Sequence, residues 1–152
     1  MDFVVDQFWA QPLAFHALVE GYEAAFPGWY RSGKGSARRD VADRMRPEGL
    51  PMGFMATRGA ALVGAAALTA AGPVLQELSP WVSGLWTHPA HRRQGVASAL
   101  IGRCTEEARG QSAAAVYTAS ATATTLFEVL GWRLREIAPY GREGLPVFEL
   151  TT

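Results

Sequence analysis

The segment with the clearest structural meaning in this 152-residue sequence reads LWTHPAHRRQGVASAL, residues 85–100. Its first residues end a run at 81–87 that is rich in Trp, Val and Leu, which is typical of a β-strand, and Pro89 stops that strand. Apolar side chains then recur at the spacing of one helical face over residues 95–109. The segment therefore predicts a strand, a basic turn and a helix in direct succession.

The turn between this strand and this helix has the chemistry of an anion site. Arg92 and Arg93 are adjacent, and the helix that follows offers free N–H groups and the positive end of its dipole. Gly95, Ala97 and Ser98 keep its first turn uncrowded. We expect a phosphate or pyrophosphate here, although two arginines in a turn can also be merely solvated.

The rest of the chain divides into short β-prone runs and amphipathic stretches separated by Gly and Pro. Strands are predicted at residues 3–5, 53–57, 61–68, 81–87, 114–119, 132–137 and 146–150, and helices at 12–26, 36–46, 95–109 and 122–130. The first helix should bury a face formed by Leu13, Ala17, Leu18, Tyr22 and Ala25. The order predicts one domain, residues 1–152, of α/β class with an α+β mixed sheet and helices on its faces.

Composition excludes several classes of protein. Hydrophobic residues make up 49% of the chain, which rules out disorder as the dominant state. Fourteen basic and fourteen acidic side chains cancel, so no global field favours nucleic acid or an anionic membrane. His, Cys and carboxylates nowhere have metal-ligand spacing, and we predict no metal.

The cysteine count and the N-terminus favour a cytoplasmic protein. Cys104 is the only cysteine, which excludes an internal disulfide, and its place on the helical stripe predicts a core residue. The first residues lack the pattern of a secretory signal, and the apolar window at 60–75 is shorter than the roughly 20 residues of a membrane span.

Two blocks of the sequence resemble the GNAT superfamily of acyl-CoA-dependent N-acyltransferases. The family signature is Gln or Arg, any two residues, Gly, any residue, then Gly or Ala, and residues 92–97 read Arg-Arg-Gln-Gly-Val-Ala. The family's frequent Asn-x-x-Ala-x-x-Leu-Tyr-x-x-x-Gly-Phe is matched in part by Ser120, Ala123, Leu126, Phe127, Gly131 and Trp132. The resemblance covers residues 3–150 and implies a mostly antiparallel sheet with one splayed parallel pair and flanking helices.

The resemblance also implies a cosubstrate, acetyl-CoA, and a set of residues around it. The CoA pyrophosphate would lie on the turn formed by Arg92, Arg93, Gln94, Gly95, Val96, Ala97 and Ser98, and the pantetheine arm along Leu85, Trp86 and Thr87. Ser120 and Phe127 would lie beside the cosubstrate at the family's Asn and Tyr positions. The implied reaction is direct attack on the thioester by a primary amine of a small molecule or a peptide terminus.

Two departures from the family leave the proton-transfer groups open. Phe127 stands where the family has a tyrosine and cannot donate a proton, and residues 81–88 contain no carboxylate. The candidates are Glu77 as base, Ser83 as the holder of a water, and Tyr140 as acid. On their own, Glu77 fits a solvated loop charge and Tyr140 fits packing.

Strict strand alternation assigns one face to Trp81, Ser83, Leu85 and Thr87, unless a bulge intervenes. The same two departures keep a second hypothesis open, a non-catalytic acyl-CoA-binding module. A phosphate site for an unrelated nucleotide is a third, but it would make the second matching block a coincidence. An exposed edge strand would allow a homodimer.

Overall fold

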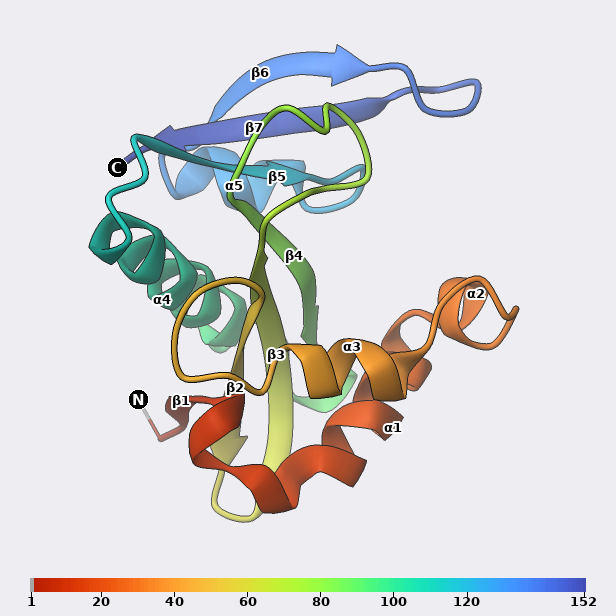
Figure 1. Ribbon diagram of the computed structural model, residues 1–152, viewed down its shortest axis with the longest axis vertical. Helices are drawn as coiled ribbons and strands as arrows, with labels where there is room; N and C mark the ends of the chain where they lie inside the picture. Colours follow the sequence, from red (N-terminus) through yellow and green to blue (C-terminus); the bar gives the residue numbers. More distant parts are fainter. Residues whose placement is uncertain (1) are drawn as a thin grey trace.

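The computed structural model describes residues 2–152 and contains one mixed seven-stranded sheet (Figure 1). Its strands are β1 (Val4–Gln7), β2 (Met52–Arg58), β3 (Ala61–Thr69), β4 (Trp81–Thr87), β5 (Ala115–Ala119), β6 (Arg133–Ala138) and β7 (Leu145–Thr151). They are ordered β1-β2-β3-β4-β5-β7-β6, and only the β4–β5 pair is parallel. The predicted mixed sheet and its seven strands are confirmed.

The helices begin and end close to the predicted residues, with local differences. They are the 3-10 turns η1 (Phe8–Ala10), η2 (Pro12–Ala14) and η3 (Pro89–His91), and the α-helices α1 (Phe15–Ala25), α2 (Pro27–Tyr30), α3 (Ala37–Asp43), α4 (Val96–Gly110) and α5 (Thr124–Val129). The hydroxyl of Ser36 accepts a hydrogen bond from the Arg39 N–H at 3.1 Å and caps α3. Helix α5 starts after Ser120 because that side chain accepts the Ala123 N–H at 2.9 Å and holds a turn there.

The helices cover both faces of the sheet. Helix α4 packs through Leu100 and Cys104 on a core that includes Phe54 of β2, whereas α1 and α3 pack on the other face against Met55 of the same strand. Figure 1 shows α4 on one side of β3 and α1 and α3 on the other, and β5, β7 and β6 running at a steep angle to β2–β4. The sheet thus consists of two differently oriented parts that meet between β4 and β5.

The predicted buried face of the first helix is only partly observed. Leu18 and Tyr22 are buried, but Leu13 is 99% exposed and Ala17 and Ala25 are exposed. Leu13 lies in the 3-10 turn η2, and the α-helix begins only at Phe15. Leu13 therefore does not continue the buried face of α1. Leu18 and Tyr22 hold α1 against the sheet, and Ala17 and Ala25 lie outside the core.

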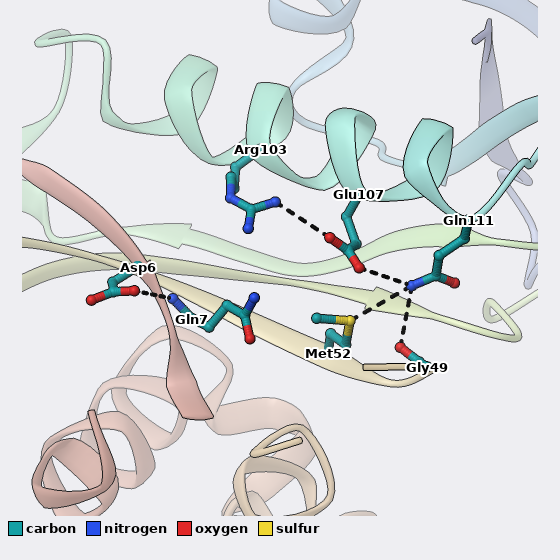
Figure 2. Close-up of polar contacts among 7 residues, drawn as sticks. All are labelled: Asp6, Gln7, Gly49, Met52, Arg103, Glu107 and Gln111. Atoms are coloured by element: carbon teal, nitrogen blue, oxygen red, sulfur yellow. Dashed lines mark hydrogen bonds and ion pairs between the residues drawn. The ribbon is translucent and has the colours of Figure 1, made fainter. Parts of the chain in front are cut away.

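The C-terminal half of α4 is tied to the start of β2 (Figure 2). The Gln111 amide donates to the Glu107 carboxylate at 3.2 Å and to the Gly49 carbonyl at 3.4 Å, and it lies 3.6 Å from the Met52 sulfur. Arg103 and Glu107 pair along the helix at 3.5 Å. Such part-exposed contacts each contribute little energy, but together they fix the direction of α4 and so the aim of its N-terminus.

The two parallel strands separate soon after they meet. Trp81 and Tyr117 form the only bridge pair between β4 and β5, and beyond it the Thr118 hydroxyl donates to the Val82 carbonyl at 3.0 Å. No ladder joins the later residues of β4 to β5. We call this opening between the ends of β4 and β5 the seam.

Candidate functional site

A cavity of about 1120 Å³ lies at the C-terminal end of β4. Its walls come from β4, the turn before α4, the first turn of α4, the outer side of α1 and the start of α5. The lining residues are Ala17, Glu20, Gly21, Ala24, Ala25, Phe26, Leu62, Leu85, Trp86, Thr87, His88, Pro89, His91, Arg92, Arg93, Gly95, Val96, Ala97, Ser98, Thr122, Ala123 and Leu126. Its size suits an extended ligand rather than a single ion.

The turn before α4 presents main-chain N–H groups to this cavity. Arg93 and Gly95 have left-handed backbones, with φ of 62° and 85°, so the chain folds tightly into the helix. The first helical bond runs from the Ala99 N–H to the Gly95 carbonyl, which leaves the N–H groups at 96–98 without helical acceptors. Arg92 and Arg93 are exposed and form no ion pair within residues 2–152. The arrangement favours an anion with several oxygens.

The structure brings nine of the twelve predicted cosubstrate residues to one cavity. They are Leu85, Trp86, Thr87, Arg92, Arg93, Gly95, Val96, Ala97 and Ser98. The other three, Gln94, Ser120 and Phe127, do not line it. Ser120 caps the turn before α5, and Phe127 is 2% exposed in the core, where its ring contacts those of Trp132 and Phe148.

The sequence leads us to expect the N-terminal helices beside the acceptor, but it does not single out the residues of α1 that form one wall of the cavity. This wall presents small side chains at Ala17, Gly21, Ala24 and Ala25, and a Cβ on Gly21 would lie 2.5 Å from the Trp86 ring. The signal was a stripe of Ala and Gly at helical spacing, which also occurs in ordinary cores. Here small residues let α1 approach β4 and leave room beside it.

A β-bulge at Gly84 reverses the predicted alternation of β4. The register of β4 against β3 shifts between Ala65 and Ala67, and Gly84 has a left-handed backbone with φ of 57°. As a result Leu85 packs on the α4 side of the sheet, and Trp86 packs on the α1 side. The prediction that Trp81, Ser83, Leu85 and Thr87 share one face is therefore wrong.

Two polar groups converge on the bulge without a hydrogen-bond partner in residues 2–152. A Cβ on Gly84 would lie 3.1 Å from Arg44 Nη1 and 3.2 Å from the Tyr22 hydroxyl, and both atoms are buried and unpaired. The Arg44 guanidinium lies over the Tyr22 ring at 5.3 Å. Burial raises the pKa of Tyr22 to about 12, so its hydroxyl stays protonated at neutral pH.

The three candidate proton-transfer groups lie in different surroundings. Ser83 directly precedes the bulge, and its hydroxyl is 2.8 Å from that of Thr69. Glu77 is exposed in the loop before β4, and Tyr140 is 54% exposed in the turn between β6 and β7. None of the three lines the large cavity.

Three further features bear on what the sequence predicts: possible metal ligands, the single cysteine and the apolar character of the helices. In residues 2–152, no group of three or more His, Cys, Asp and Glu side chains is placed to hold a metal ion. Cys104 is fully buried, and burial raises the pKa of its thiol to about 12, which makes it a poor nucleophile. Among the helices of this same range, none has the length and apolar character of a membrane-spanning segment.

Comparison with known families identifies the class of protein that this fold and cavity define. Residues 15–132 match the Acetyltransferase (GNAT) family, and because the match spans most of the chain, the protein belongs to that family. No curated protein sequence matches the chain.

Solved structures of this family share the fold. An aminoglycoside 6'-N-acetyltransferase in complex with coenzyme A is 13% identical with a TM-score of 0.78, and covers 97% of this chain and 96% of its own. The protein yncA from Salmonella typhimurium, with its cofactor acetyl-CoA, is 16% identical with a TM-score of 0.77, over 99% of this chain and 94% of its own. The aminoglycoside 6'-N-acetyltransferase from Enterococcus faecium is 15% identical with a TM-score of 0.77, over 97% and 96%. At these identities the likeness establishes the fold.

Proposed function

We propose that the protein is an N-acetyltransferase that moves the acetyl group of acetyl-CoA to a primary amine of a small molecule or a peptide terminus. The observation that carries the proposal is the turn before α4, whose free N–H groups and two unpaired arginines open on the cavity at the seam. This turn suits the CoA pyrophosphate. The protein has a single cysteine, Cys104, which is buried and forms no disulfide. This agrees with a reducing compartment, and we propose that the protein is cytoplasmic.

The proposed chemistry is a direct transfer. The neutral amine nitrogen attacks the thioester carbonyl and the new C–N bond forms. The C–S bond then breaks, the CoA sulfur leaves as a thiolate, and the nitrogen gives up one proton to water, which leaves a neutral amide. A main-chain N–H of β4 near the bulge would polarise the carbonyl oxygen, and the residues 85–87 would align the pantetheine arm. Positioning and a preorganised donor supply most of the rate gain in such a reaction.

An alkylamine is mostly protonated at neutral pH, so a group must accept its proton before attack. Of the three candidates, Ser83 lies nearest along the chain to the bulge and can hold a water with Thr69, whereas Glu77 and Tyr140 lie on exposed turns. We therefore assign the water-holding role to Ser83. Ser83→Ala should lower kcat by about tenfold or more, while Glu77→Gln and Tyr140→Phe should each lower it less than about threefold.

The decisive experiment is an amine panel with acetyl-CoA, in which thiol release and the mass of the acetylated product are both followed. Transfer to an amine would support the enzyme. Tight CoA binding by calorimetry without transfer to any amine would instead favour a non-catalytic acyl-CoA-binding module. That alternative draws on Phe127, which is buried in the core and carries no acidic group. Failure to bind CoA would contradict both.

A further inference from the structure

The strongest unexplained feature of the molecule is the pair of unpartnered groups at the bulge. The Tyr22 hydroxyl and Arg44 Nη1 approach the Gly84 backbone from α1 and from the end of α3, so closely that a Cβ on Gly84 would lie 3.2 Å and 3.1 Å from them. Tyr22 lies beside Trp86, and neither Tyr22 nor Arg44 itself lines the large cavity. Trp86 Nε1 is a further buried and unpartnered N–H on the same side of the sheet, with its ring 6.0 Å from that of Tyr22. Tyr22 and Arg44 lie against each other, and the nearby Arg44 charge opposes the effect of burial on the pKa of Tyr22, but none of the three groups has a hydrogen-bond partner within residues 2–152.

At neutral pH all three groups can donate a hydrogen bond. A guanidinium and an indole N–H only donate, and the raised pKa of Tyr22 keeps its hydroxyl protonated. Buried donors are normally paired, because an unpaired one costs stability. A cluster of this kind is therefore best matched by a ligand that brings acceptor oxygens.

The charge around the cluster makes that ligand an anion. Arg44 is only part-exposed and has no ion pair within residues 2–152. Of the two acidic residues of α3, Asp43 is exposed, and Asp40 already accepts a hydrogen bond from the Tyr30 hydroxyl at 2.7 Å. Residues 31–46 contain six cationic and two acidic side chains, so the local field is positive. An amine with several ammonium groups would be repelled here.

The position of the cluster suggests that the anionic group belongs to the acceptor amine and not to the cosubstrate. Gly84 lies on β4 directly before the residues that line the cavity, and the anion site for the cosubstrate lies at the other end, on α4. The Arg44 guanidinium lies over the Tyr22 ring at 5.3 Å, and the residue as a whole is part-exposed. Two separate positive regions thus flank the seam.

We infer that the acceptor is an amine with a carboxylate close to its amino group, such as an α-amino acid, and that Arg44 and Tyr22 bind this carboxylate. The inference rests on the proposed acetyl transfer and specifies its substrate class. Arg44 and Tyr22 would orient the acceptor so that its amine meets the acetyl group at the bulge. An arginine guanidinium matches a carboxylate in a bidentate pair, which makes Arg44 the main group of this site.

The test compares matched acceptors and matched variants. The twenty standard amino acids and the aminoglycoside kanamycin are assayed with acetyl-CoA, and the best amino acid is then compared with its own α-carboxamide, which keeps the amine and loses the charge. We expect kcat/KM for the acid to exceed that for the amide by at least about tenfold. Arg44→Gln should reduce this ratio to within about threefold, and Arg44→Lys should retain part of it.

The control is Arg39→Gln, which removes the same charge from an exposed position on α3. It should keep the acid-to-amide ratio of the natural protein. Tyr22→Phe keeps the ring under Arg44 and should lower the ratio by a few fold. CoA affinity, measured by calorimetry, should be the same in all four variants, which also shows that they are folded.

The outcomes separate the two proposals. If amides or kanamycin are acetylated as well as amino acids, or if Arg44→Gln keeps the ratio, the acetyltransferase stands and the carboxylate site is wrong. If CoA binds but none of these amino acids is acetylated, the acceptor inference fails, and transfer to another amine in the wider panel would leave the proposed function standing. A preference for acids that disappears in Arg44→Gln and persists in Arg39→Gln supports both.

Discussion

The two ends of the seam are built in different ways. At the α4 end the ligand-facing groups are main-chain N–H groups, held by the backbone of Arg93 and Gly95. At the bulge they are side chains, Tyr22 and Arg44, which come from separate helices and meet only in the folded protein. A site made of main chain needs only a short local pattern, whereas a site made of side chains can change with every substitution. The first is therefore suited to a constant cosubstrate and the second to a variable acceptor.

The largest expected effect tests the main-chain end. Ala97→Glu places a negative side chain on the first turn of α4, facing the cavity, and should weaken CoA binding by well over tenfold, more than about 1.4 kcal/mol. Gly102→Glu is the matched control, since it adds the same charge to an exposed, open position on the same helix. Calorimetric titration of both variants decides the point. Equal affinities would mean that the pyrophosphate is not bound at this turn.

The next effect tests the bulge. Gly84→Ala adds a Cβ at φ of 57° that would lie 3.0 Å from the Tyr22 ring and 3.1 Å from Arg44. Backbone strain and crowding should lower the free energy of unfolding by about 1–3 kcal/mol. Gly59→Ala has a similar φ of 61° but meets no atom, so it reports the strain alone. Urea unfolding of both variants measures the difference, and equal losses would show that the space beside Gly84 is not constrained.

A smaller effect concerns the buried cysteine of α4, Cys104. Because burial raises the pKa of Cys104 to about 12, the folded state holds the thiol proton more tightly than the unfolded state does. Below the pKa of the unfolded thiol the contribution of this group is constant, and above it stability falls as pH rises. The free energy of unfolding should drop by about 1 kcal/mol from this group between pH 9 and pH 10.

Cys104→Ala should remove that part of the decline and leave acetyl transfer at pH 7 unchanged. Unfolding titrations at the two pH values test the first statement, and the amine assay tests the second. A variant with the same pH slope as the natural protein, or one that has lost transfer, would contradict the assignment of Cys104 to the core.

The smallest effect is expected at Phe127, where the family has its tyrosine. Its ring is 2% exposed between Trp132 and Phe148, so a hydroxyl added there would enter an apolar core and not the cavity. Phe127→Tyr should raise kcat by at most about tenfold, because a thiolate can leave without a protein acid. Leu126→Tyr is the informative partner, since Leu126 does line the cavity. A large gain from Phe127→Tyr would show that the natural sequence lacks a needed acid.

The contrast between the two ends also explains what the sequence could predict. The strand, turn and helix at 81–110 follow from local patterns, and so does the proposed anion site, which depends on that local backbone. The bulge does not, since a glycine within a strand only hints at one, and the alternation of β4 failed there. The meeting of Tyr22, Arg44 and Gly84 depends on contacts between residues far apart in sequence, and no local pattern encodes it.

The single bridge pair between β4 and β5 has a consequence for the mechanics of the protein. Strands β1–β4 and β5–β7 form two parts of the sheet. The two parts are joined by the Trp81–Tyr117 bridge and by the hydrogen bond from Thr118 to Val82, and both pack on the core beneath α4. A molecule lying in the seam would supply hydrogen-bond partners to the unpaired edges of β4 and β5, as an added strand would. It should therefore raise the melting temperature in proportion to its occupancy and slow amide exchange along both edges. The cosubstrate would therefore bridge the two parts of the sheet as well as react. Its release would weaken the contact between β4 and β5 without changing the topology of the protein.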